Sequence, residues 1–180
     1  MITTMFIRQS VPADFPHILA LINQAARAYR GVIPDDQWHE PYMSADELSR
    51  EIANGVEFSV AEESGDVLGV MAVQDRGDVT LVRHAYVSPT RQRTGVGRTL
   101  LHHIEAHTTK PILIGTWADA AWAIAFYQRN GFTLIPGNET GRLLRTYWSI
   151  PQRQIETSVV LANRQWTAGS DNASTDHRPI

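Results

Sequence analysis

Apolar residues recur at helical or strand spacing through the first half of the chain, so its secondary structure can be predicted. After a short strand at 5–8, apolar positions return every three or four residues over 15–29, which predicts an amphipathic helix. A second helix is expected at 44–54, where Ser44 and Glu47 have the spacing of a capping box. Apolar runs then predict three strands, at 56–62, 67–74 and 79–87. The turn-forming segments between these strands are short, so neighbouring strands are expected to be antiparallel.

The second half of the chain alternates helical and strand patterns. Helices are expected at 95–109 and 119–129, and strands at 112–117, 132–135 and 158–161. The connection 136–157 is long for a hairpin and is expected to contain a helix around 142–148. This order predicts an α/β fold with about seven strands in a mixed sheet, an antiparallel N-terminal half and about four or five helices. We expect one domain over 1–168 and a disordered tail over 169–180.

The composition narrows the classes of function. The chain of 180 residues contains no cysteine, which excludes thiol catalysis, cysteine-ligated zinc, iron–sulfur clusters and disulfides. No apolar run approaches the roughly 18 residues of a membrane span, and residues 1–10 lack the apolar core of a signal peptide. We therefore expect a cytoplasmic protein with no membrane partner. The net charge of −3 argues against a nucleic-acid binder.

Charged residues are unevenly distributed along the chain. The range 31–66 holds ten acidic residues and one basic residue, whereas 83–98 holds four arginines and no acidic residue. Scattered, solvated surface charge would explain this distribution. A cationic site for a phosphate-bearing ligand, together with an anionic rim for a cationic ligand, would explain it as well.

Glycines mark the junction between the strand at 79–87 and the helix after it. The segment 92–98 (QRTGVGR) offers free amide groups at the start of the helix, which suit a phosphate, and its two arginines add positive charge. A dinucleotide fingerprint would need a third glycine where the chain has Leu100, and a Walker loop would need a lysine where it has Arg98. The segment does match the pattern Gln/Arg-x-x-Gly-x-Gly/Ala at a strand-to-helix junction.

This segment resembles the pyrophosphate loop of the GNAT superfamily of acetyl-CoA-dependent N-acetyltransferases. Residues 84–89 (HAYVSP) look like the fourth strand of that family and the turn into its loop. Residues 123–132 (AIAFYQRNGF) are similar to its Ala-x-x-Phe-Tyr-x-x-x-Gly-Phe segment. The close resemblance covers 79–135, while the part before it agrees in the order of its elements. The resemblance implies a GNAT-like fold and acetyl-CoA as the cosubstrate.

By the same resemblance, the loop holds the pyrophosphate and the preceding strand contacts the pantetheine arm. The amide of Val87 is then a candidate donor to the thioester oxygen. One position departs from the family, because an asparagine common three residues before Ala123 is replaced here by Ala120. The cofactor-binding residues implied by the resemblance are Tyr86, Val87, Gln92, Arg93, Thr94, Gly95, Val96, Gly97 and Arg98.

The resemblance makes Tyr127 the candidate general acid. A phenol titrates at about pH 10 and an alkyl thiol at about 8.5, so a neutral tyrosine can protonate a departing thiolate. The alternative is a core tyrosine packed beside Phe126. Many family members carry a carboxylate base on the fourth strand, but 79–83 offers none. His84 is the candidate base, acting directly or through water, and it is equally compatible with a structural histidine hydrogen-bonded between sheet and helix.

In the family, the loop between the first two helices lines the acceptor pocket. Here that loop, 29–43, carries carboxylates and aromatic residues, and Tyr29 and Trp38 are the predicted substrate-binding residues. Aromatic faces and carboxylates suit a cationic amine, although an ordinary polar loop has a similar composition. A second group could instead recognise a carboxylate on the acceptor or form a dimer contact, namely Arg142, Arg145, Tyr147 and Trp148.

The sequence therefore predicts an acyltransferase that moves the acetyl group of acetyl-CoA to a primary amine of a small molecule, amino acid or peptide, by direct attack in a ternary complex. The alternative is a non-catalytic acetyl-CoA-binding sensor or regulatory module, because the strand carboxylate is missing and Ala120 departs from the family. No metal is expected, since the histidines lack a ligand spacing shared with carboxylates. No nucleic-acid partner is expected, and a homodimer is left open.

Overall fold

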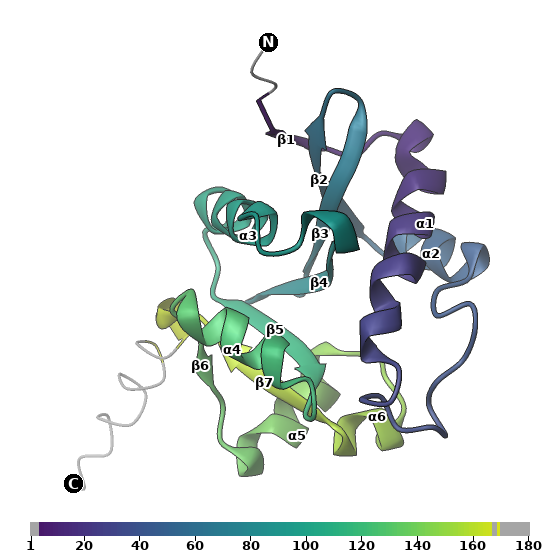
Figure 1. The fold of residues 1–180 in the computed structure, drawn as a ribbon. Coiled ribbons are helices and arrows are strands. Elements are labelled where there is room, and N and C mark those ends of the chain that lie inside the picture. The colour runs from purple at the N-terminus through teal and green to yellow at the C-terminus, as the bar shows by residue number, and fades with distance from the viewer. Residues whose placement is uncertain (1–3, 167–168, 170–180) are drawn as a thin grey trace, which may run out of the picture. The chain divides into compact units, whose positions relative to one another are not determined.

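A seven-stranded mixed sheet organises the chain in the computed structural model, which describes residues 4–166 and 169 (Figure 1). The strands lie in the order β1-β2-β3-β4-β5-β7-β6. Their bounds are Phe6–Gln9 for β1, Val56–Glu63 for β2, Asp66–Asp75 for β3, Thr80–Val87 for β4, Ile112–Trp117 for β5, Thr133–Leu134 for β6 and Ser158–Ala162 for β7. The pairs β1–β2, β2–β3, β5–β7 and β6–β7 are antiparallel, and the sheet contains one parallel pair. The predicted α/β fold with an antiparallel N-terminal half is confirmed.

The helices follow the predicted order and differ mainly at their ends. Their bounds are Phe15–Ala26 for α1, Ala45–Ala53 for α2, Val96–His107 for α3, Ala121–Arg129 for α4, Gly137–Tyr147 for α5 and Gln152–Glu156 for α6. Helix α1 is shorter than expected because its last turn tightens into a 3-10 turn at Arg27–Tyr29. The helix expected around 142–148 begins earlier, at Gly137. Helix α6 was not predicted, because its five residues are too few to show a helical period.

Contacts within the chain divide it into two units, which are described separately. The N-terminal unit is Met1–Asp75 with Val82–His107, and the C-terminal unit is Arg76–Leu81 with Thr108–Ile180. Strand β4 therefore starts in the C-terminal unit and ends in the N-terminal unit. The single domain expected over 1–168 stays a prediction. The tail expected over 169–180 lies outside the described residues, except for Gly169.

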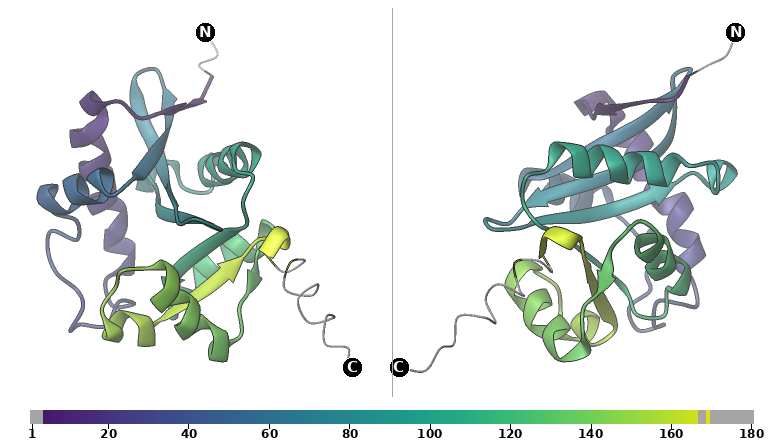
Figure 2. Two further views of the ribbon diagram at one scale, coloured as in Figure 1. Left: turned by 180° about the vertical axis from the view of Figure 1, so that it is seen from behind. Right: turned by 90° about the vertical axis from the view of Figure 1, so that its left-hand side faces the viewer.

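In the N-terminal unit, α1 and α2 cover one face of the strands and α3 covers the other (Figure 2). The burial of β2 shows the reason, because its alternate residues Val56, Phe58 and Val60 are buried and pack with side chains of α1 and α2. Helix α2 begins where the sequence predicts. The hydroxyl of Ser44 accepts a hydrogen bond from the amide of Glu47 at 3.1 Å, so one of the free amides of the first turn is satisfied.

Gly69 in β3 lets α3 approach the sheet closely. A Cβ atom at this position would lie 2.9 Å from Cγ1 of Val96, 3.2 Å from the carbonyl oxygen of Tyr86 and 3.3 Å from Cδ1 of Leu100. The first of these atoms belongs to a buried β-branched side chain and the second to the backbone, so neither can easily move aside. Because Val96 is the first residue of α3, this contact also positions the loop that precedes the helix.

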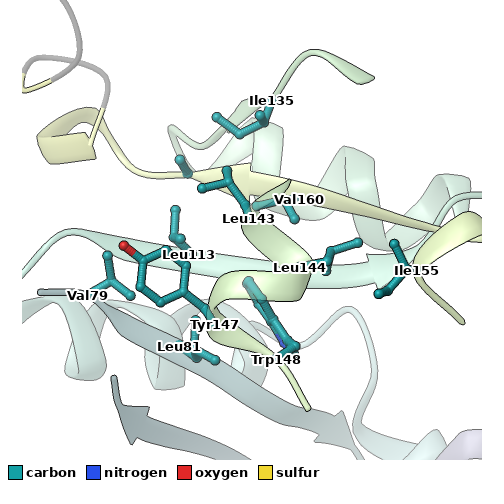
Figure 3. Close-up of a cluster of buried hydrophobic side chains, with 11 residues drawn as sticks. Val79, Leu81, Leu113, Ile135, Leu143, Leu144, Tyr147, Trp148, Ile155 and Val160 are labelled. Atoms are coloured by element: carbon teal, nitrogen blue, oxygen red, sulfur yellow. The ribbon is translucent and has the colours of Figure 1, made fainter. Parts of the chain in front are cut away.

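The core of the C-terminal unit packs α5 and α6 against β5 and β7 (Figure 3). Trp148 lies so close to Gly115 that a Cβ atom on the glycine would be 3.1 Å from the indole ring. The hydroxyl of Tyr147 donates a hydrogen bond to Oδ2 of Asp78 at 2.9 Å. Burial, together with this carboxylate, raises the pKa of Tyr147. Both aromatic residues, considered from the sequence for acceptor recognition or a dimer contact, are thus core residues.

Replacing Gly69 by alanine should lower the free energy of unfolding by about 1–3 kcal/mol, because the added methyl group overpacks the contact with Val96. Chemical denaturation followed by circular dichroism measures the change. The matched control is Gly137→Ala at the start of α5, where a Cβ atom would meet nothing within 4 Å. This control should leave stability unchanged or raise it slightly. An equal loss in both variants would contradict the role given to the Gly69 contact.

Candidate functional site

The loop predicted to bind pyrophosphate is a tight turn between β4 and α3. Its φ angle is positive at Arg93 (62°) and at Gly95 (94°), so the backbone leaves the extended conformation at both residues before the helix begins. The first hydrogen bond of the helical ladder runs from the amide of Thr99 to the carbonyl oxygen of Gly95 at 2.9 Å. The amides of residues 96–98 therefore have no acceptor within the helix. Amides in this position at a helix N-terminus suit an anion.

Neighbouring elements hold the beginning of this loop. The amide of Ser88 donates to the carbonyl oxygen of Leu68 in β3 at 2.8 Å. Nη2 of Arg91 lies 2.6 Å from Oε2 of Glu63, the last residue of β2. The hydroxyl of Thr94 donates to the carbonyl oxygen of Arg91 at 2.6 Å. Thr94, a predicted cofactor-binding residue, thus uses its hydroxyl to close the loop itself.

The end of β4 departs from a regular strand at His84. The φ angle of this residue is +48°, in the left-handed region that residues other than glycine rarely adopt. Successive side chains of a regular strand point to opposite faces of the sheet. Arg83 and His84 nevertheless both contact the carboxylate of Glu51. The irregular backbone lets two consecutive side chains reach the same partner.

Glu51, near the end of α2, is the centre of this cluster. Its Oε1 accepts a hydrogen bond from Nη2 of Arg83 at 2.9 Å, and its Oε2 lies 3.0 Å from Nε2 of His84. Nη1 of Arg83 donates to Oε1 of Gln74 at 2.9 Å, and Nε2 of Gln74 donates to the carbonyl oxygen of Asn54 at 3.0 Å. Burial by itself would raise the pKa of Glu51. The hydrogen bond with His84 and the charge of Arg83 outweigh burial, so this pKa lies below its usual value.

The imidazole of His84 is also held by an aromatic ring. It stacks on Phe58, with ring centroids 5.8 Å apart and an interplanar angle of 18°. Only 13% of the side chain is exposed. His84 therefore links β4 to α2, as the structural alternative expects. Its second nitrogen, Nδ1, has no hydrogen-bond partner among the described residues, so the candidate base retains a nitrogen for proton transfer.

Glu51 was missed by reasoning from the sequence, because the search for a carboxylate was confined to the strand. A signal was available in the helical spacing. Glu51 follows the fully buried Leu48 by three residues, which places both side chains on the same face of α2. A carboxylate that β4 lacks is thus supplied by the helix that packs beside it.

Aromatic side chains of the predicted acceptor loop meet Tyr86 near the end of β4. The rings of Tyr29 and Tyr42 each lie edge-to-face with Tyr86, with 6.4 Å between centroids in both pairs. Tyr42 also stacks on Trp38, at 5.7 Å, and on His39, at 6.2 Å. The structure therefore brings both predicted substrate-binding residues and one predicted cofactor-binding residue into a single group, called here the aromatic cluster.

Tyr127, the predicted general acid, lies on α4 in the C-terminal unit. Its ring is buried and lies edge-to-face with Phe126, at 5.1 Å between centroids, and with Phe132, at 6.0 Å. Ala120, where the family commonly has asparagine, is fully buried at the start of the same helix. This packing agrees with the alternative of a core tyrosine. The role of Tyr127 as an acid stays a prediction.

Within the part of the chain that the structure describes, no three or more His, Asp or Glu side chains are arranged to hold a metal ion. In the same residues, no helix has both the length and the apolar character needed to cross a membrane. Arg142 and Arg145 are exposed on α5, and their predicted contact with an acceptor carboxylate or a second copy is not tested by these observations.

Comparisons with known proteins identify a family domain and a fold. Residues 54–134 match the model of the acetyltransferase (GNAT) domain. No curated protein sequence matches the chain. Among solved structures, a GNAT-family acetyltransferase of Staphylococcus aureus Mu50 is 14% identical, and the match covers 89% of this chain and 98% of that chain with a TM-score of 0.67.

Two further structures show the same similarity. The PaiA N-acetyltransferase of Thermoplasma acidophilum, in complex with coenzyme A, is 16% identical. The match covers 89% of this chain and 98% of that chain, with a TM-score of 0.67. The ribosomal-protein-S18-alanine N-acetyltransferase of Escherichia coli is 18% identical. The match covers 89% of this chain and 93% of that chain, with a TM-score of 0.59. At these identities the structures show the fold, which extends beyond the matched domain to α1 and α2. Residues 54–134 thus match a GNAT acetyltransferase domain, and the chain has the fold of the GNAT acetyltransferases.

Proposed function

We propose that the chain is an N-acetyltransferase that moves the acetyl group of acetyl-CoA to a primary amine of a small molecule, an amino acid or a peptide, by direct attack in a ternary complex. The observation that carries the proposal is the loop between β4 and α3, where the unbonded amides at the start of the helix suit an anion. The coenzyme A in the Thermoplasma acidophilum structure supports this choice of ligand. The proposal includes a cytoplasmic location and requires no metal.

The residues of this loop suit a diphosphate. The amides of 96–98 lie at the positive end of the α3 dipole. Residues 83–98 contain no acidic side chain that would repel the ligand. In this proposal, Gly97 keeps the first turn of α3 open to the phosphates, because it has no Cβ atom. Three exposed side chains of the loop add hydrogen-bond donors, namely Gln92, Arg93 and Arg98.

The proposed transfer moves two protons. The amine nitrogen attacks the thioester carbonyl carbon, a C–N bond forms, the C–S bond breaks, and His84 accepts the proton that the amine loses. Tyr127 donates its phenolic proton to the departing thiolate. The amide of Val87 polarises the thioester carbonyl, and Tyr86 contacts the pantetheine arm. The roles of Tyr127, Tyr86 and Val87 come from the resemblance to the family, whereas that of His84 is also supported by its place beside Glu51.

The aromatic cluster supports a cationic acceptor. Aromatic faces attract an ammonium group, and the loop that supplies most of the cluster also carries the exposed carboxylates Asp35 and Asp36. Tyr86 connects the cluster to the strand that is proposed to hold the cosubstrate. A peptide amine is included among the acceptors because the Escherichia coli neighbour is named for an alanine of a ribosomal protein.

Replacing Gly97 by glutamate should abolish binding of coenzyme A, because a carboxylate in the first turn of α3 would fill the site and repel the diphosphate. Isothermal titration calorimetry measures the loss. The matched control is Gly137→Glu, which places the same side chain in the first turn of α5 and should leave the affinity unchanged. Retained affinity in the Gly97 variant would place the ligand elsewhere.

Replacing Tyr127 by phenylalanine should lower kcat about 10²- to 10⁴-fold and leave the affinity for coenzyme A unchanged, because only the proton donor is removed. Release of free thiol from acetyl-CoA, measured over a panel of amines, follows the reaction. The matched control is Tyr147→Phe, which removes another buried hydroxyl and should lower stability while keeping kcat. If the unaltered protein binds coenzyme A but no amine of the panel causes release of thiol, the alternative of a non-catalytic sensor is favoured.

Replacing His84 by alanine should flatten the acidic limb of the profile of kcat/KM against pH. This limb reports protonation of the essential base in the free enzyme, so it should vanish when the base is removed. The matched control is His17→Ala, an exposed histidine on α1, which should keep the limb. An acidic limb that survives the loss of His84 would assign the proton transfer to another group.

A further inference from the structure

Arg83 and His84 both contact the carboxylate of Glu51, and the reaction described above gives Glu51 no part. We propose that Glu51 is a positioning residue, which holds the imidazole of His84 in the tautomer with its proton on Nε2 and leaves Nδ1 to accept the proton of the attacking amine. The catalytic half of this inference rests on the proposed function. The tautomer does not, because it depends only on contacts within the N-terminal unit.

The tautomer follows from the chemistry of the two partners. An ionised carboxylate can only accept hydrogen bonds, so the 3.0 Å contact between Oε2 of Glu51 and Nε2 of His84 requires a proton on Nε2. In a neutral imidazole the lone pair is then on Nδ1. The pKa of Glu51 lies below its usual value, so the carboxylate is ionised at neutral pH. Its other oxygen already accepts a hydrogen bond from Arg83, which makes Glu51 itself a poor base.

Arg83 limits the electrostatic effect of Glu51 on the imidazole. A carboxylate alone would favour the imidazolium form and keep the base protonated. The guanidinium, 2.9 Å from the same carboxylate, opposes this effect, and Gln74 holds it in place from the other side. Among the residues that the structure describes, the charged groups that contact or adjoin the imidazole are Glu51 from α2 and Arg83 from β4, while β2 presents the uncharged ring of Phe58.

The backbone at His84 supports a functional role for the contact. A positive φ is unfavourable for a residue with a side chain, and such strain persists where the surrounding structure enforces it. A regular strand conformation would restore the alternation of β4 and separate the side chains of Arg83 and His84. The positive φ at His84 therefore allows the side chains of both Arg83 and His84 to reach Glu51.

Histidine titration by NMR tests the proposal without any assay of activity. The signal of His84 is assigned as the one missing from the variant His84→Gln, and its ¹⁵N shifts in the unaltered protein should show a neutral ring protonated on Nε2. Glu51→Gln should move the titration of His84 to lower pH, because the carboxylate is lost and the guanidinium remains. Arg83→Gln should move the same titration to higher pH, because the carboxylate then acts alone. Shifts of opposite sign are not expected from a general loosening of the fold.

The matched control for these variants is Glu62→Gln. Glu62 is 19% exposed and pairs with Arg8 at 2.7 Å, close to the 22% exposure and 2.9 Å pairing of Glu51 with Arg83. Its loss should leave the titration of His84 unchanged. A proton on Nδ1 in the unaltered protein would overturn the proposal. So would a folded Glu51→Gln variant in which His84 titrates as before, and if that variant does not fold, Arg83→Gln still decides the sign.

Rate profiles then separate the two halves of the inference. The acidic limb of kcat/KM should move to lower pH in Glu51→Gln, by the same amount as the NMR titration, since a base of lower pKa stays unprotonated to lower pH. A shifted titration with an unmoved limb would overturn the assignment of Nδ1 as the proton acceptor. A shifted titration in a protein that acetylates no amine would overturn the proposed function and leave the tautomer assignment standing.

Discussion

The contact between Gly69 and the first turn of α3 sets the position of the loop that is proposed to bind the diphosphate. The missing Cβ atom lets Val96 lie against β3, and the loop before α3 is held by Ser88 at its other end. In the proposal, the binding groups are backbone amides, whose directions follow from the path of the chain. The geometry of the loop therefore depends on packing beneath the helix as much as on the glycines within the loop.

Strand β4 and its partners also explain the uneven charge along the chain. Part of the acidic range pairs with arginines of the basic range, as Glu51 does with Arg83 and Glu63 with Arg91. These partly buried pairs join elements of the fold, an arrangement that neither solvated surface charge nor a two-ended binding site anticipates. Exposed charge remains on both sides, with Asp35 and Asp36 in the acceptor loop and two arginines in the glycine loop.

The sequence predicts the features that depend on local spacing. Ser44 caps α2, and the strand, the glycine loop and α3 follow in the expected order. The features that the sequence does not predict depend on contacts between residues far apart along the chain. His84 and Glu51 are 33 residues apart along the chain, and no local pattern records their hydrogen bond or the positive φ that permits it. Tyr147 was a candidate for recognition because sequence alone does not show that its hydroxyl meets Asp78 in the core.

Strand β4 begins in the C-terminal unit and ends in the N-terminal unit, so a cut of the chain after α3 does not separate the two units. Val79 and Leu81 are fully buried in the core of the C-terminal unit, and Asp78 accepts the hydrogen bond from the hydroxyl of Tyr147 in the same unit. All three of these residues precede α3 along the chain. A fragment that began after His107 would lack these side chains and would leave a cavity where they pack. A fragment that begins at Thr108 is thus not an autonomous module, and a chimera built from two relatives has to transfer the short segment 76–81 together with the C-terminal half.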